Sequence, residues 1–163
     1  MRTFATTRWR QWRPWGVALL LPAFVLLRPA NANLSPADLN PAAIAYKLPN
    51  QIEWKDTPIG AKMAVMRGDP DKPGPYIVLV KWTPQHMSRP HFHPNDRFIT
   101  VISGTWWVGT GSKFDPESTV AMPAGSFVTH FAKQIHYDGA KDGECVLQIV
   151  GEGPATATPA ETK

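Results

Sequence analysis

The sequence predicts an all-β domain with the architecture of an antiparallel sandwich or barrel. From residue 51 onward, short apolar or alternating runs follow one another, and no window of about 10–12 residues shows the apolar stripe of a helix. The segments between these runs are rich in Gly, Pro, Asp and Asn, residues that favour tight turns. Many short strands at regular spacing are typical of two packed antiparallel sheets.

Ten strands are expected, each bounded by turn residues. In chain order they are residues 51–54, 62–67, 76–82, 89–93, 97–103, 105–110, 119–122, 126–130, 135–139 and 145–151. The turns "GDPDKPGP" at 68–75, "HPND" at 93–96 and "PAG" at 123–125 combine proline with glycine, Asn or Asp. The adjacent tryptophans of "TWWVGT" are expected to place one ring on each face of their sheet.

The first 32 residues have the pattern of a secretory signal peptide. A basic head without acidic residues precedes an apolar run, residues 16–27, and small residues at Ala30 and Ala32 form a cleavage site. The run is shorter than the about 20 residues that a transmembrane helix needs. We therefore expect a periplasmic or secreted protein, cleaved after Ala32 and without a membrane span afterwards. An uncleaved N-terminal anchor is the alternative.

Removal of this segment changes the charge of the chain. Five of the 17 Lys and Arg residues lie in it and none of the 13 acidic residues do, so residues 33–163 carry a formal charge of −1. The basic character of the full chain therefore gives no evidence for nucleic-acid binding, which needs a basic face on the folded domain.

The remaining chain is expected to hold one domain. Residues 33–50 form an N-terminal extension, residues 51–154 the β domain, and residues 155–163 a Pro/Thr/Ala-rich tail that is expected to be disordered. The single cysteine, Cys145, excludes an intramolecular disulfide, and its apolar neighbours indicate a small buried side chain.

Two histidines one residue apart, His91 and His93, are the first candidate metal ligands. Side chains two residues apart on a strand point to the same face, so both imidazoles can approach one ion. Imidazole is a common ligand of transition metals when it is neutral. Prolines 90 and 94 flank the pair and apolar strands follow, which favours a metal site over two surface histidines.

The segment "HFHPNDRFITVISG", residues 91–104, resembles the first motif of the cupin superfamily. That motif has a His-x-His pair, a glutamate after three or four intervening residues and, after six more, a glycine that Gly104 matches. The second cupin motif is matched loosely by "FAKQIHYDGA", residues 131–140, in which His136 keeps the ligand position while the Pro, Gly and Asn of the motif are replaced. The resemblance covers about residues 62–154 and implies a double-stranded β-helix, the jelly-roll barrel of cupins.

Cupins bind a metal ion inside the barrel with three histidines and one glutamate. Carried over by position, the resemblance implies His91, His93 and His136 as ligands of a divalent ion, and Fe, Mn, Zn, Ni and Cu all accept imidazole. The glutamate is absent and Arg97 stands at its position. Because two cations a few ångströms apart repel by several kcal/mol at an effective dielectric of about 20, Arg97 cannot simply take the place of the carboxylate.

Three interpretations of Arg97 stay open on the sequence alone. In the first, three histidines bind the metal, and Arg97 turns aside to hold the carboxylate of a substrate, a group that guanidinium binds with two hydrogen bonds. In the second, Arg97 abolishes metal binding and the barrel binds an organic anion. In the third, another side chain completes the metal site. The candidates for that role are His130, His86 and Gln134, although His130 is more typical of a surface residue at a strand end and His86 of an exposed turn.

Two further side chains are expected to line the pocket. Gln148 lies within "VLQIV" and Trp106 within the tryptophan pair, so either side chain can contact a bound substrate. Taken together, these residues predict an exported metal-dependent oxygenase or isomerase that acts on a small organic acid. The alternative is a cupin that binds an organic anion or a sugar without catalysis. Cupins commonly dimerise by extending their sheets, so the resemblance also implies a homodimer.

Overall fold

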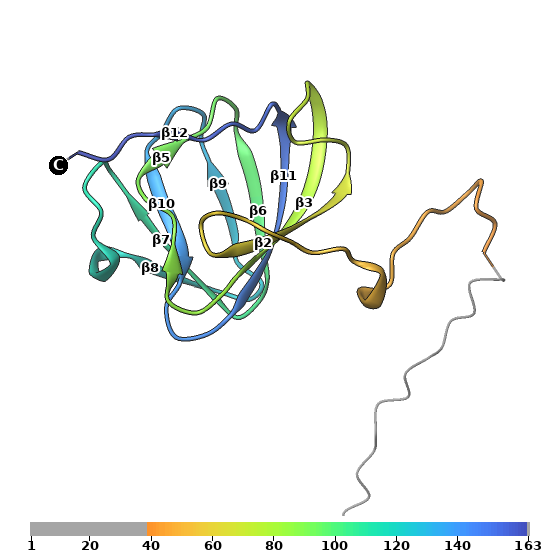
Figure 1. Ribbon diagram of the computed structural model, residues 1–163, viewed down its shortest axis with the longest axis horizontal. Helices are drawn as coiled ribbons and strands as arrows, with labels where there is room; N and C mark the ends of the chain where they lie inside the picture. The colour runs from red at the N-terminus through yellow and green to blue at the C-terminus, as the bar shows by residue number, and fades with distance from the viewer. Residues whose placement is uncertain (1–38, 163) are drawn as a thin grey trace, which may run out of the picture. The chain divides into compact units, whose positions relative to one another are not determined.

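Twelve strands form two antiparallel sheets in the part of the chain that the structure describes. A computed structural model of the protein describes residues 39–162, and residues from Ala45 onward belong to one compact unit. The first sheet has the order β1-β2-β3-β11-β6-β9. The second has the order β12-β5-β10-β7-β8, and β4 also pairs with β10. Figure 1 shows the two sheets facing each other, with β3 and β11 in one and β10 and β7 in the other.

The strand bounds follow the expected pattern with small shifts. In the first sheet they are β1 (Lys55–Asp56), β2 (Ala61–Arg67), β3 (Gly74–Trp82), β11 (Cys145–Gly153), β6 (Arg97–Ser103) and β9 (Phe127–His130). In the second sheet they are β12 (Thr158–Pro159), β5 (His91–Phe92), β10 (His136–Ala140), β7 (Thr105–Thr110), β8 (Val120–Pro123) and β4 (His86–Met87). The predicted all-β double-stranded β-helix is confirmed.

The core lies between the sheets. Along β11, Leu147 and Ile149 are buried, whereas the residues between them are only partly covered, so one face of the strand points into the barrel. β3 pairs with β11 over nine residues and contributes Tyr76 and Val78 to the same core. Each such buried side chain contributes about 1.5–3 kcal/mol of hydrophobic stabilisation. Cys145 is fully buried, as expected, and burial raises the pKa of its thiol to about 12.

The glycine that ends the first motif is required by the backbone. Gly104 connects β6 to β7 with a φ of +74°, and a Cβ atom there would lie 2.2 Å from the carbonyl oxygen of Glu144. Any other residue would therefore be strained and would collide with the chain that leads into β11. This tight turn places Arg97, at the start of β6, and Trp106, in β7, on sheets that face each other.

Two of the expected strands differ clearly from the structure, and the structure has a strand, β4, that was not expected. The expected strand at 51–54 is absent, because residues 49–51 form a 3-10 turn in which the Gln51 side chain accepts a hydrogen bond from the Leu48 amide. The expected strand at 89–93 shortens to His91–Phe92, since the flanking prolines have no amide hydrogen to donate to a ladder. The additional strand β4 packs closely on Gly139, where a Cβ atom would lie 2.2 Å from the His86 carbonyl oxygen.

The expectation of a disordered tail at residues 155–163 is wrong for the part that the structure describes. β12 pairs with β5, and the amide of Ala160 donates to the carbonyl of Pro90 at 2.9 Å. The amide of Thr162 donates to the carbonyl of Ser112 at 2.9 Å, and Glu161 forms an ion pair with Arg89. This segment is held by its backbone along a sheet edge, so its side chains show no apolar pattern that a sequence reading could detect.

The proposed signal peptide, residues 1–32, lies outside the described residues, as does the beginning of the expected extension at 33–50. Within residues 39–162, no helix has the length and apolar character needed to cross a membrane.

Candidate metal centre

Three histidines from adjacent strands meet inside the barrel. β5 and β10 run antiparallel, and His136 is the Cα partner of His91, while His93 follows two residues after His91. The ring centroid of His91 lies 4.9 Å from that of His93 and 4.5 Å from that of His136. One nitrogen from each ring lies within 4.8 Å of the other two. The structure therefore brings together the three histidines that the resemblance implied as ligands.

Backbone carbonyl groups fix the orientation of all three rings. Each Nδ1 atom lies within hydrogen-bond distance of one carbonyl oxygen. The acceptors for His91, His93 and His136 are the carbonyl oxygens of Arg89 (2.8 Å), Thr156 (2.9 Å) and Gln134 (3.0 Å). Because a carbonyl oxygen only accepts, each Nδ1 carries the hydrogen and each neutral ring keeps a lone pair on Nε2. This tautomer is the one that metal-binding histidines adopt when a second group holds the other nitrogen.

None of the three Nε2 atoms carries a hydrogen, so none can donate a hydrogen bond to another. The Nε2 atoms of His91 and His93 are 3.1 Å apart, and neither carries a hydrogen to donate to the other. The Nε2 atom of His136 is buried without a hydrogen-bond partner. A divalent ion that binds imidazole at about 2.0–2.1 Å would satisfy all three lone pairs. The residues present therefore fit a metal ion.

The surroundings of His93 and His136 keep these two rings neutral. Burial lowers the pKa of His93 to about 3, with a further contribution from the Arg97 charge. Burial also lowers the pKa of His136 to about 4, although the nearby Asp138 carboxylate opposes the shift. At neutral pH both imidazoles are therefore in the form that binds metal.

Arg97 lies beside the histidines rather than away from them. Its Nη1 donates a hydrogen bond to the Nε2 of His93, and its Nε is buried without a partner. No carboxylate lies within ion-pair distance of its guanidinium among residues 39–162. Burial lowers the pKa of Arg97, while Tyr76 and Asp138 act in the opposite direction. A buried guanidinium without a counter-ion is well suited to bind an anionic ligand.

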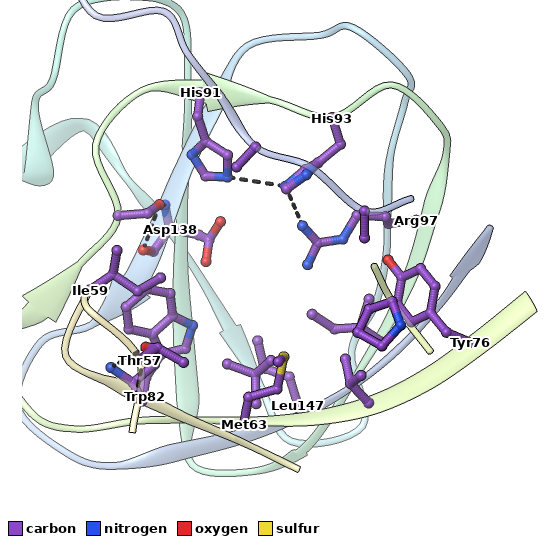
Figure 2. Close-up of a pocket in the computed structure, with 18 of the residues that line it drawn as sticks. Thr57, Ile59, Met63, Tyr76, Trp82, His91, His93, Arg97, Asp138 and Leu147 are labelled. Carbon is purple, nitrogen blue, oxygen red and sulfur yellow. Dashed lines mark hydrogen bonds between the residues drawn. The ribbon is translucent and has the colours of Figure 1, made fainter. Parts of the chain in front are cut away.

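A cavity of about 240 Å³ lies next to the histidines and Arg97. Figure 2 shows Arg97 and Asp138 entering it from opposite sides, with His91 and His93 at one end and Met63 and Leu147 at the other. The remaining wall is mostly apolar and includes Val78, Val80, Ile149 and the rings of Tyr76, Trp82 and Trp106. The cavity therefore has one charged end and a large apolar surface, which suits a small acid with an apolar body.

The other predicted pocket residues have different positions. Trp106 lines the cavity and is 1% exposed, and its indole Nε1 donates to the Asp138 carboxylate at 3.1 Å. Trp107 points to the opposite face, where the Lys141 ammonium lies 4.2 Å from its ring centroid. The prediction for Gln148 is wrong. It alternates with the cavity-lining Leu147 and Ile149 and therefore points away from the cavity.

Among the three candidates for an extra ligand, only His130 lies in the interior. The imidazole of His86 is exposed and contacts Thr83 and the Pro84 carbonyl. The side chain of Gln134 is exposed, and this residue orients His136 through its backbone carbonyl instead. His130 is 7% exposed, so its interpretation as a surface residue at a strand end is wrong.

Asp138 is the site residue that sequence reasoning missed. It follows His136 by two residues on β10, is buried, and lines the cavity. The strand alternation that linked His91 to His93 also links His136 to Asp138, so the signal was present in "HYDGA". Its importance depends on Trp106 of the neighbouring strand, a partner that only the strand register identifies.

Solved structures with this fold have low sequence identity to the chain. A polyketide cyclase, RemF from Streptomyces resistomycificus, is 13% identical with a TM-score of 0.61, and the match covers 74% of this chain and 87% of that one. An uncharacterised double-stranded β-helix protein from Klebsiella pneumoniae is 20% identical with a TM-score of 0.52, over 66% and 90%. KdgF from Halomonas sp. is 16% identical with a TM-score of 0.53, over 67% and 95%. At these identities the similarity shows the fold alone.

None of the curated proteins compared with the chain matches it. A family model described as the ChrR Cupin-like domain matches residues 43–156, which is more than half of the chain. That range contains the three histidines of the two motifs and Arg97. It also contains every strand of both sheets except β12. The chain therefore belongs to the ChrR Cupin-like domain family of the cupin superfamily.

Proposed function

We propose that this protein binds a divalent metal ion through His91, His93 and His136 and uses it in a reaction on a small organic acid. The observation that carries this proposal is the set of three Nδ1 hydrogen bonds to backbone carbonyls, which leave three Nε2 lone pairs directed at one another. Lone pairs that face each other in a buried site are unfavourable without a cation. A bound cation would accept all three lone pairs, one of which now accepts a hydrogen bond from Arg97.

The protein groups around the site have separate roles in this proposal. A divalent ion bound there would supply Lewis acidity and open coordination positions. Arg97 would bind the carboxylate of the acid with the guanidinium hydrogens that His93 does not use. The apolar wall, which includes Met63 and Leu147, would hold the body of the acid and exclude water. An oxygenase or an isomerase reaction is compatible with this division of roles.

Metal analysis of protein purified without a histidine tag tests the proposal. We expect about one divalent ion per chain, and an affinity at least roughly 100-fold lower in a His91→Ala, His93→Ala double variant. His86→Ala is the matched control, since this exposed imidazole lies outside the histidine cluster and forms its hydrogen bonds within its own turn. Wild-type protein that neither contains nor takes up a divalent ion would contradict the proposal, as would a double variant with unchanged affinity.

The second candidate function is binding of an organic anion without a metal. The observation in its favour is the hydrogen bond from Arg97 to the Nε2 of His93, which occupies one of the three lone pairs. On this alternative, metal-free wild-type protein binds organic acids, and Arg97→Glu abolishes that binding while it sharply raises metal affinity. Unchanged metal content in Arg97→Glu would show that the charge at this position does not control metal binding, and would argue against the role of Arg97 in both candidates.

We also propose that the protein is exported and cleaved after Ala32. The support for this proposal is the sequence pattern of residues 1–32, a basic head followed by an apolar run and a small-residue cleavage site. Mass spectrometry of the protein from fractionated cells measures the mature N-terminus directly. A chain that keeps residues 1–32, or that stays in the cytoplasmic fraction, would contradict export with cleavage.

A further inference from the structure

The buried polar atoms without hydrogen-bond partners gather at one place in the barrel. Among residues 39–162 there are five such side-chain atoms, and four of them belong to Arg97, His130 and His136. Both ring nitrogens of His130 are among the four. An unsatisfied buried polar group costs about 1–3 kcal/mol, so a fully buried imidazole without any partner requires an explanation. The three-histidine site does not supply one, because His130 is not part of it.

His130 lies next to His136, the histidine that β10 contributes to the first site. It ends β9, where its Cα partner is Arg97, and it belongs to the sheet opposite to that of His136. The ring centroids of His130 and His136 are 3.7 Å apart. Asp138 completes the group from β10, and one ligand atom from each of these three residues lies within 4.8 Å of the other two. All three residues are buried.

We propose that His130, His136 and Asp138 form a second metal position that shares His136 with the first. Two imidazoles and one carboxylate are a donor set that binds divalent transition metals. The proposal rests on the proposed function only in taking His136 as a metal ligand. Because the single Nε2 atom of His136 binds one ion at a time, the two positions are alternatives, and the chain holds one ion.

The second position differs from the first in having a carboxylate among its three donors, although Arg97 is the Cα partner of His130. The first position has three neutral imidazoles, one of which accepts a hydrogen bond from the Arg97 cation. The second position contains the Asp138 carboxylate, whose negative charge offsets part of the charge of the ion. One oxygen of that carboxylate accepts from Trp106 Nε1 at 3.1 Å, a contact that holds the group in place. The carboxylate that the first motif lacks is thus available from the second.

Two of the three residues of the second position, His130 and His136, also line a separate pocket, whereas Asp138 lines the cavity beside Arg97. A pocket of about 330 Å³ is lined by His130 and His136 together with Thr110, Ser118 and Thr129. The cavity beside Arg97 is lined instead by His91, His93 and Asp138. The second position therefore lies between the two cavities, with its imidazoles at one and its carboxylate at the other.

Titration of metal-free protein with Co²⁺, followed by calorimetry and visible absorption, tests the second position. We expect the His91→Ala, His93→Ala double variant to bind one Co²⁺ per chain, at least roughly 100-fold more weakly than wild type and with a changed spectrum. Adding His130→Phe or Asp138→Asn to the double variant is expected to abolish this binding. His130→Phe keeps a ring of similar shape and breaks no hydrogen bond, so it is expected to fold. Asp142→Asn, at an exposed residue, is the matched control.

The outcomes separate this inference from the proposed function. If wild type binds Co²⁺ and the double variant does not, the second position is wrong and the first stands. Residual binding that persists with unchanged affinity in both triple variants would also overturn the second position. If wild type itself binds no Co²⁺, both positions are wrong.

Discussion

The two halves of the histidine cluster have the same number of imidazoles and opposite charges. The half from β5 and β6 contains His91, His93 and the Arg97 cation, whereas the half from β9 and β10 contains His130, His136 and the Asp138 carboxylate. In the first half, backbone carbonyls orient both rings and Arg97 donates to one of them. In the second half, His130 has no partner at all. The comparison teaches that a cation and an anion can be accommodated side by side, each near the charge that attracts it.

The largest expected effect comes from His136, the histidine that the two proposed metal positions share. His136→Ala removes a ligand from both metal positions, so we expect the affinity for Co²⁺ to fall by more than roughly 100-fold, further than in the His91→Ala, His93→Ala variant. Gln134→Ala is the control, since the carbonyl that orients His136 belongs to the backbone and remains. Calorimetric titration measures both. A smaller loss in His136→Ala than in the double variant would contradict the sharing of this residue.

The next effect concerns the Arg97 charge, whose removal is expected to change metal binding and acid binding in opposite directions. Arg97→Gln removes the cation that donates to His93, so we expect metal affinity to rise by about tenfold or more. The same substitution removes a charge-assisted hydrogen bond to the acid, so binding of a probe such as benzoate is expected to weaken by roughly 10–100-fold. Fluorescence titration of Trp82 and Trp106, which line the cavity, measures benzoate binding.

Gln148→Ala is the matched control for Arg97→Gln, because Gln148 points away from the cavity. Both affinities are expected to stay unchanged in this variant. If Gln148→Ala weakened benzoate binding as much as Arg97→Gln, the assignment of the acid to the cavity beside Arg97 would be wrong.

The third effect is the dependence of stability on pH in the metal-free protein. Burial holds the pKa values of His93, His130 and His136 at about 3, about 2 and about 4, below the value of 6.5 for a free histidine. The unfolded chain therefore binds protons below about pH 6.5 that the folded chain does not, so the free energy of unfolding falls as the pH drops from about 6.5 towards about 4. Each of these histidines contributes about 1.4 kcal/mol per pH unit inside that window.

Urea denaturation in the presence of EDTA at about pH 7 and about pH 5 measures this loss. His130→Phe removes one of the three titrating groups, so the difference between the two pH values is expected to shrink in that variant. Metal-free protein that is equally stable at both pH values would show that the rings are not buried as neutral groups.

The smallest effect concerns the support of the Asp138 carboxylate. Trp106→Phe removes the indole donor at 3.1 Å, which is expected to cost about 1 kcal/mol of stability and to weaken Co²⁺ binding at the second position by about tenfold. Trp82→Phe is a closely matched control, because its Nε1 lines the same cavity and has no partner to lose. Equal effects of both substitutions on Co²⁺ binding to the His91→Ala, His93→Ala variant would contradict the role of Trp106.

The fold could be predicted from the sequence because most strands have an alternating pattern of apolar side chains and are bounded by turn residues. The alternation in β11 and the glycine at position 104 are local signals that the structure uses directly. The segment at 155–162 gave no such signal, since it is held by backbone hydrogen bonds to an edge strand. The strand expected at 51–54 failed for a related reason: the side chain of Gln51 satisfies the Leu48 amide and stabilises a turn.

Site residues could be predicted only where their spacing along the sequence matched a known motif. His91 and His93 are two residues apart and His136 occupies the ligand position of the second motif, so these three were found. His130 and Gln148 were assigned to the wrong side, because apolar residues lie on both sides of each in the sequence and the face of the sheet is decided by packing. The link between Trp106 and Asp138 depends on the register of β7 and β10, which no local pattern encodes.

The carbonyl that orients His93 belongs to Thr156, 63 residues further along the chain. During synthesis the His-x-His pair therefore leaves the ribosome long before the group that fixes one of its rings has been made. Until residue 156 emerges and its segment closes along β5, His93 is free to rotate and to present either nitrogen. The ring orientations that the three-histidine cluster needs are therefore complete only after the whole barrel has been translated.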